Sequence, residues 1–324
     1  MKNSTLTFIL LSFLMGIPTI FAQKEINISS KNHSIHSFDL VANLVLVEGT
    51  LHKEAGWFIL DTGMPDLILN KRYFYSGTST EQFVSLSGKT TKVSKPIVSF
   101  SLGILKCNNK EVIALSMPQL ERKTNRKILG LIGHRLLKNK EVIIDYDQSI
   151  ISFYNTQKNG ATKVATHLPP PVENLPFKWK GHIPYITLQW QKDNLNFGID
   201  TGASINLIDQ KHDDKLSHSK RPSILLVNVG NTRSSVTYSA INQLTVQQKP
   251  FPAMRMATYD LTALNQQLAG KKMDGILGYQ FLRRQRVAIN YRNKTLSLWR
   301  PSSDKERLYV KMEDQKAKLR MLQQ

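Results

Sequence analysis

The chain has 324 residues, and its 44 Lys or Arg against 24 Asp or Glu give a net charge of +20 at pH 7. A single cysteine, Cys107, excludes an intramolecular disulfide and most thiolate metal sites. No zinc-finger spacing or aromatic-interleaved basic motif supports nucleic-acid binding. The basic residues are spread along the chain, which is typical of a solvated surface. A functional alternative is that they give the protein weak association with an anionic membrane or cell-wall surface.

Residues 1–22 have the features of a signal peptide. Lys2 supplies a positive charge, residues 6–15 are mostly apolar, and the small residue Ala22 precedes polar Gln23. The apolar stretch is shorter than the ~20 residues that span a bilayer. The sequence therefore predicts cleavage after Ala22 and export to the periplasm or the extracellular space, followed by an N-terminal segment over residues 23–39.

An internal repeat dominates the rest of the chain. Asp61-Thr62-Gly63 recurs as Asp200-Thr201-Gly202, and each copy lies between two apolar runs, which predicts strand, tight turn and strand. Further along, Gly130-Leu131-Ile132-Gly133 recurs as Gly275-Ile276-Leu277-Gly278. Landmarks repeated in the same order over more than 100 residues indicate duplication of a whole folding unit. We expect a first lobe over residues 40–156 and a second over residues 181–300.

The connecting segments differ in composition from the lobes. Residues 157–180 contain Pro169-Pro170-Pro171 and no apolar periodicity, which predicts an extended linker. Residues 301–324 form a charged C-terminal tail.

Within the lobes, β-branched and aromatic runs predict a mostly β fold with few helices. Hairpins are expected over residues 142–154 and 287–299. Gly88 and Gly230-Asn231 lie between further β-rich runs, so each marks a hairpin that is a candidate flap over a cleft. Short helices are expected over residues 133–139, 261–268 and 278–284.

The paired carboxylates suggest a specific chemistry. If the lobes pack about a pseudo-twofold axis, Asp61 and Asp200 face each other, and two carboxylates at hydrogen-bond distance share one proton. The ionised partner can then take a proton from a bound water, while the protonated partner donates to a peptide carbonyl oxygen. Such a pair hydrolyses amides without a covalent intermediate.

These motifs resemble those of the retropepsin-like aspartic proteases, in the single-chain, two-lobe form of bacterial aspartyl protease family proteins. The resemblance covers nearly all of residues 40–300, and Gly133-His134-Arg135-Leu136-Leu137 is similar to the Gly-Arg-Asn-Leu-Leu type of the retroviral enzymes. It implies two acid-protease β-barrel lobes about a pseudo-twofold axis, an active-site cleft between them, and an extended polypeptide substrate beneath a hairpin flap. It implies no cofactor and no metal.

The resemblance also implies roles for single residues. Asp61 and Asp200 would be catalytic, Thr62 and Thr201 would brace the lobes through reciprocal hydrogen bonds, and Gly63 and Gly202 would hold substrate backbone. Ser204, in the usual Ala203-Ser204 continuation of the second copy, would support the pair.

The first copy departs from the family pattern because Met64-Pro65 stands where a small residue is normal. Met64, Asp66 and Ala203 are candidate substrate-pocket residues, with turn stabilisation as the alternative role of Asp66. Neither Met64 nor Ala203 offers the hydroxyl that favours ionisation in pepsin-like enzymes, so we expect a less acidic pH optimum.

Two other acidic sites carry weaker signals. Residues 211–218 collect metal-capable side chains, but their spacing fits no zinc pattern and favours a polar surface loop. Asp145 has Asn290 as its counterpart in the repeat, which indicates a structural role.

The sequence therefore predicts an exported aspartic endopeptidase. The alternative is a catalytically weak or inactive peptide-binding protein that kept the fold, because activity depends on the site and not on the fold. A glycosidase with two acidic residues is a distant third, since that chemistry does not require symmetric Asp-Thr-Gly turns. Both halves lie on one chain, so we expect a monomer.

Overall fold

The computed structural model describes residues 26–86, 88–162, 168–218, 224–227, 233–246, 249–251, 253–284 and 286–299. The expected signal peptide, its cleavage site, the charged tail and the Gly230-Asn231 turn lie outside these residues.

The first lobe is built on a sheet of the order β11-β6-β12-β5-β4-β3, with the hairpins β9/β10 and β7/β8 beside it. Its strands and helices are β3 (Asp39–Val41), β4 (Leu44–Leu51), β5 (Glu54–Leu60), β6 (Ile68–Asn70), β7 (Gln82–Val84), β8 (Thr90–Lys92), β9 (Ile97–Leu102), β10 (Leu105–Glu111), β11 (Ile113–Leu115), α1 (Pro118–Thr124), β12 (Ile128–Ile132) and α2 (His134–Leu137).

The second lobe has a sheet of the order β20-β23-β26-β19-β27-β18-β17-β24-β25, with β16 paired to β17 and a separate β21/β22 hairpin. Its elements are β16 (Lys178–Lys180), β17 (Ile183–Trp190), β18 (Asp193–Ile199), β19 (Leu207–Asp209), the 3₁₀-helix η1 (Gln210–Lys215), β20 (Ser217–His218), β21 (Ile224–Val227), β22 (Arg233–Val236), β23 (Tyr238–Ile241), β24 (Leu244–Val246), β25 (Lys249–Pro250), β26 (Met254–Tyr259), α3 (Thr262–Gln267), β27 (Gly275–Leu277) and α4 (Tyr279–Leu282).

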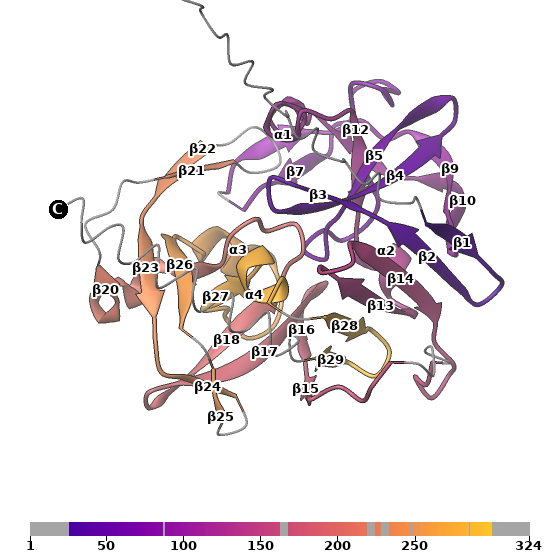
Figure 1. Ribbon diagram of the computed structural model, residues 1–324. Coiled ribbons are helices and arrows are strands. Elements are labelled where there is room, and N and C mark those ends of the chain that lie inside the picture. Colours follow the sequence, from indigo (N-terminus) through magenta and orange to yellow (C-terminus); the bar gives the residue numbers. More distant parts are fainter. Residues whose placement is uncertain are drawn as a thin grey trace, which may run out of the picture.

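A third sheet joins the two lobes (Figure 1). Its order is β1-β2-β14-β13-β28-β29-β15, and strands β13 and β28, one from each repeat, pair antiparallel at its centre. The strands are β1 (Asn27–Ser29), β2 (His33–Ser37), β13 (Lys140–Asp145), β14 (Ile150–Asn155), β15 (Glu173–Pro176), β28 (Val287–Asn290) and β29 (Thr295–Leu298). The expected hairpins over residues 142–154 and 287–299 are confirmed.

The two lobes share one unusual strand arrangement. In the first, β12 lies between β5, to which it is parallel, and β6, to which it is antiparallel; in the second, β27 lies in the same way between β18 and β19. This register places the repeated glycines against neighbouring backbone. A Cβ on Gly130 would lie 2.4 Å from the Ile68 carbonyl oxygen, and one on Gly275 would lie 2.5 Å from that of Leu207. The repeated glycines are therefore required by close packing.

Two segments outside the expected lobes contain strands. Residues 157–180 are not only an extended linker, because β15 and β16 lie within them and Leu175 is buried. Residues 23–39 contribute β1 and β2, and β2 pairs with β14 along its whole length. The short strands β2 and β15 pair with β14 and β29, which lie far away in the sequence, so local pattern alone does not reveal them.

The expected helices are present but shorter than predicted, and α1 was not predicted. Of its residues only Leu120 and Thr124 are buried, which leaves too narrow an apolar stripe for recognition by periodicity.

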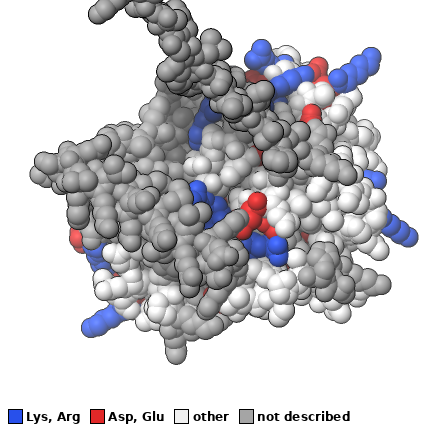
Figure 2. All heavy atoms as spheres, viewed as in Figure 1, with Lys and Arg blue, Asp and Glu red and all other residues white. Residues whose placement is uncertain are grey.

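Among the described residues, no helix is long and apolar enough to cross a membrane. Figure 2 shows Lys and Arg side chains at scattered positions on the visible face.

Candidate active site

The two Asp-Thr-Gly turns meet where the lobes face each other. Each turn connects two strands that flank the same central strand, β5 and β6 on either side of β12, and β18 and β19 on either side of β27. The backbone N–H of Asp61 donates to the Ile132 carbonyl, and that of Asp200 donates to the Leu277 carbonyl, both at 3.0 Å. The repeated apolar-apolar-Gly segments therefore anchor the turns that carry the carboxylates.

Thr62 and Thr201 connect the lobes through four buried hydrogen bonds. The N–H of each residue donates to the hydroxyl of the other, at 3.1 Å and 3.0 Å. Each hydroxyl then donates across the interface, Thr62 to the Ile199 carbonyl and Thr201 to the Leu60 carbonyl, both at 2.9 Å. This is the reciprocal bracing that the resemblance implied, and it fixes one turn relative to the other.

The two glycines pack directly on the carboxylate of the opposite lobe. A Cβ on Gly63 would lie 2.7 Å from Asp200 Cγ, and one on Gly202 would lie 2.3 Å from Asp61 Cγ. Glycine is needed at both positions because any side chain would occupy the space of a carboxylate.

The Asp61 and Asp200 carboxyl groups lie side by side, because the Gly63 nitrogen is 3.0 Å from Asp61 Oδ1 and 3.2 Å from Asp200 Oδ1. Two carboxyl groups this close favour sharing one proton. Burial, and then the charge of Asp200, raises the pKa of Asp61 well above its ordinary value of 3.8. Burial also raises the pKa of Asp200, but N–H groups of Gly202 and Gly63, which donate to its Oδ1 at 2.8 Å and 3.2 Å, oppose the shift. Asp61 is 5% exposed and Asp200 is more open to the cleft. Backbone N–H groups of Gly63 and Met64 oppose the rise at Asp61 as well, so the pair titrates as a unit, and the greater exposure of Asp200 is the geometric difference between its two members.

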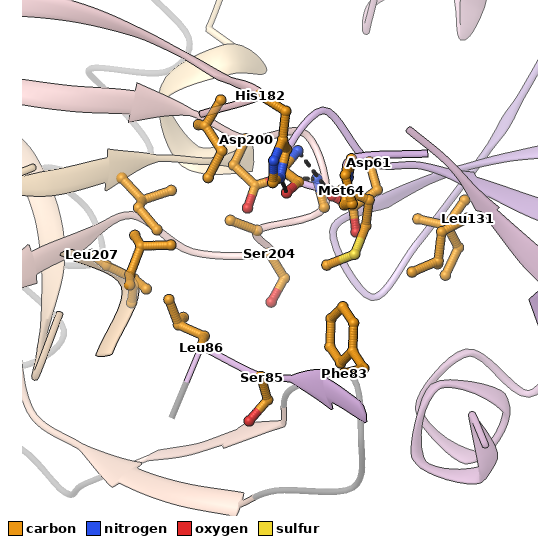
Figure 3. Close-up of a pocket in the computed structure, with 18 of the residues that line it drawn as sticks. Asp61, Met64, Phe83, Ser85, Leu86, Leu131, His182, Asp200, Ser204 and Leu207 are labelled. Carbon is orange, nitrogen blue, oxygen red and sulfur yellow. Dashed lines mark hydrogen bonds between the residues drawn. The ribbon is translucent and has the colours of Figure 1, made fainter. Parts of the chain in front are cut away.

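The carboxylates lie at the base of a cavity of about 480 Å³ between the lobes. In Figure 3, Phe83, Ser85 and Leu86 lie across the cavity from the carboxylates, and Met64 points toward Phe83. These residues belong to or follow β7, and the β7/β8 hairpin reaches the second lobe, where Gln267 Nε2 donates to the Ser85 carbonyl at 3.4 Å. The hairpin around Gly88 is therefore the flap. The β21/β22 hairpin contributes no residue to the described lining of the cavity.

Most of the remaining lining is apolar and comes from both lobes. It includes Leu44, Ile59, Leu120, Leu131, Ile183, Ile205, Leu207, Leu264, Leu268 and Ile276.

The predicted pocket residues divide into two groups. Met64 and Ala203 line the cavity, whereas Asp66 does not. Asp66 instead forms ion pairs with Lys110, at 2.6 Å, and Arg135, at 3.2 Å, and accepts from the backbone N–H of Leu67. Of its two predicted roles, the structure supports turn stabilisation.

Ser204 lies in the cavity wall, but its hydroxyl does not bond either carboxylate. It accepts instead from Lys123 Nζ of the first lobe at 3.0 Å, and its carbonyl accepts from Asn43 Nδ2 at 3.2 Å. Ser204 is thus a contact between the lobes, which corrects its expected role beside the pair.

His182 is a cleft residue that sequence reasoning missed. It lines the cavity, and its Nε2 donates to the Gly63 carbonyl at 2.6 Å (Figure 3). A single histidine outside any motif carries no local signal; only its place immediately before a strand of the repeat could have identified it.

Residues 211–218 are not simply a polar surface loop. Their first part forms η1, in which His212 is buried and its Nε2 lies 3.1 Å from Asp274 Oδ1; Lys211 pairs with the same oxygen at 2.6 Å. The acidic partner comes from a distant segment, so the local spacing did not reveal it. Within the described residues, no group of three or more His, Cys, Asp or Glu is arranged to hold a metal ion. Asp145 bonds Arg286 Nε at 2.8 Å, which agrees with its expected structural role.

Residues 186–281 match the aspartyl protease family model. The match runs from β17 through the second Asp-Thr-Gly turn into α4, and the first lobe repeats the same strand arrangement around the same turn. The predicted aspartic-protease fold, mostly β with two lobes, is thereby confirmed.

Among solved structures, an aspartic proteinase from Irpex lacteus is similar, with a TM-score of 0.47 and 12% identity over 83% of this chain and 98% of that one. No curated protein sequence matches the chain.

Proposed function

We propose that the protein is an aspartic endopeptidase that hydrolyses peptide bonds with water activated between Asp61 and Asp200. The observation that carries this proposal is that two carboxyl groups from different lobes converge on the Gly63 N–H at the base of one cavity. The family match of the second lobe supports it.

The asymmetry of the pair assigns the proton transfers. Ionised Asp200 takes a proton from a bound water, whose oxygen attacks the carbonyl carbon, while Asp61 donates its proton to the carbonyl oxygen. In the second step Asp61 takes a proton from one hydroxyl of the tetrahedral intermediate, and Asp200 gives its proton to the nitrogen as the C–N bond breaks. Both carboxyl groups then have their initial protonation, and no covalent intermediate forms.

The cavity supports an extended polypeptide substrate with apolar side chains on both sides of the cleaved bond. Apolar residues of both lobes line it, and the flap side chains Phe83 and Leu86 lie opposite the carboxylates. Burial of such side chains supplies binding free energy of about 25 cal/mol per Å² of apolar surface.

Hydrolysis of a denatured protein mixture tests the proposal. We expect turnover that a statine-containing inhibitor blocks and that Asp61→Asn and Asp200→Asn each reduce at least ~100-fold. Asp193→Asn is the matched control, because its side chain is 51% exposed and pairs only with Lys215 among the described residues. Turnover that survives both dyad substitutions would refute the proposal.

The alternative is an inactive peptide-binding protein, which Met64 favours because it occupies cleft space where the family pattern has a small residue. If the wild-type protein binds a non-cleavable peptide isostere but hydrolyses no peptide, it is a peptide-binding protein. Export with cleavage after Ala22, the monomeric state and association with an anionic surface remain further proposals.

A further inference from the structure

His182 reaches from the second lobe into the catalytic turn of the first. It precedes β17, and its Nε2 donates to the Gly63 carbonyl at 2.6 Å across 119 residues of sequence. Gly63 is also the residue whose N–H lies 3.0 Å from Asp61 Oδ1 and 3.2 Å from Asp200 Oδ1. One side chain therefore restrains the residue that contacts both carboxylates.

The repeat contains a counterpart that cannot ionise. Asn43 lies immediately before β4, as His182 lies immediately before β17. The two positions are equivalent in the repeat, because Leu46 of β4 pairs with Ile59 of β5 in the same way that Tyr185 of β17 pairs with Gly198 of β18. Asn43 Nδ2 also crosses to the other lobe, where it donates to the Ser204 carbonyl at 3.2 Å. The pseudo-twofold pair thus consists of one neutral amide and one imidazole, and only the imidazole bonds a catalytic turn.

The surroundings of His182 contain several titratable groups. Asp200 lies on its own lobe, and Asp61 shares the first-lobe turn with Gly63; His134 faces it from α2. Burial lowers the pKa of His182 below its usual value, and its bond to Gly63 and the charge of Asp200 oppose this shift only in part. Burial, and then the charge of His182, lowers the pKa of His134 to about 4.

We infer that His182 is a positioning residue of the proposed reaction, which holds Gly63 against both carboxylates and keeps the negative charge of the pair on Asp200. This inference rests on the proposed peptidase function. A protonated imidazole beside Asp200 stabilises the ionised carboxylate, so Asp200 stays available as the base at lower pH. Two identical Asp-Thr-Gly turns would give Asp61 and Asp200 the same surroundings, and His182 makes the surroundings of the two carboxylates differ.

The His182→Gln variant separates the two effects. The glutamine Nε2 takes the place of the imidazole Nε2, so it can still donate to the Gly63 carbonyl, but it cannot carry a charge. We expect an acid limb of kcat/KM that moves up by about 0.5 to 1 pH unit, with a smaller loss of plateau kcat than in a variant without the donor. His182→Leu removes the donor as well, so its plateau kcat should fall about tenfold or more. The control Asn43→Ala removes the counterpart bond and should leave the acid limb in place.

A second readout does not depend on turnover. In NMR titrations of ¹³C-labelled aspartate carboxyl groups, assigned with Asp61→Asn and Asp200→Asn, His182→Gln should raise the apparent pKa at which the pair ionises. If the wild type hydrolyses no peptide, the proposed function fails while this titration still decides the role of His182. An unchanged titration together with an unchanged acid limb in folded His182→Gln protein would overturn the inference.

Discussion

Gly202 has no room for a side chain because the carboxylate of Asp61, from the other lobe, occupies that space. A Cβ at Gly202 would lie 2.3 Å from Asp61 Cγ, and the reciprocal distance from Gly63 to Asp200 Cγ is 2.7 Å. Each lobe thus limits where the carboxylate of the other can lie.

Gly202→Ala should displace Asp61 while the strands around it stay in place. We expect about a 100-fold loss of kcat/KM, because displacement of a catalytic group by about 1 Å costs that much, and a loss of about 1–3 kcal/mol in the free energy of unfolding from overpacking. Hydrolysis assays and urea unfolding measure the two effects. A kcat/KM equal to that of the wild type would show that the turn accommodates the added methyl group without displacing Asp61.

Thr201→Val should weaken the connection between the lobes. The substitution keeps the shape of the side chain but removes the hydroxyl that accepts from the Thr62 N–H and donates to the Leu60 carbonyl in a buried site. We expect a loss of about 1–3 kcal/mol or more in the free energy of unfolding, measured by urea titration. Thr187→Val is the matched control on exposed surface and should stay within about 0.5 kcal/mol of the wild type. Equal effects of the two substitutions would contradict the proposed brace.

The free energy of unfolding of Asp61→Asn, relative to that of the wild type, should increase as pH rises. The pKa of Asp61 is raised in the folded state, so stability that the protonated carboxyl contributes is fully present below pH 3.8 and is lost as pH rises through the higher folded pKa. Asparagine carries no such charge. The stability of the variant relative to the wild type should therefore increase across this window, by at most about 1.4 kcal/mol per pH unit, and then level off. Urea unfolding at a series of pH values measures it; a difference that does not vary with pH would show that Asp61 ionises normally.

Met64→Ser should make the pair more acidic. Met64 lines the cleft directly after Gly63, and a hydroxyl at this position can donate to a catalytic carboxylate and favour its ionisation. We expect the acid limb of kcat/KM to move down by about 0.5 to 1 pH unit, with a higher KM because apolar lining is lost. Ala203→Ser, at the equivalent position of the second copy, should act in the same direction without the rise in KM. If the acid limb of kcat/KM stays in place in both variants, a hydroxyl at these positions does not control the acidity of the pair.

The mostly β fold, the duplication and the candidate carboxylates could be read from the sequence. Local alternation determines where strands form, and the required glycines persist in both copies because their neighbours leave no space for a Cβ. The flap around Gly88 was one of two equivalent candidates, and only its contacts with the second lobe distinguished it.

The tertiary structure decided what lies around the pair. It brought His182 to Gly63 and Lys123 to Ser204, paired Asp66 with Lys110, and placed β1, β2 and β15 in the sheet that joins the lobes. The three side-chain contacts join residues that are 44 to 119 positions apart in the sequence. They therefore depend on how the chain packs in three dimensions. Sequence periodicity reports only which face of an element is buried, and not which distant side chain it meets. The chain by itself therefore determined that there are two acids in matched turns, and packing determined the asymmetry between them.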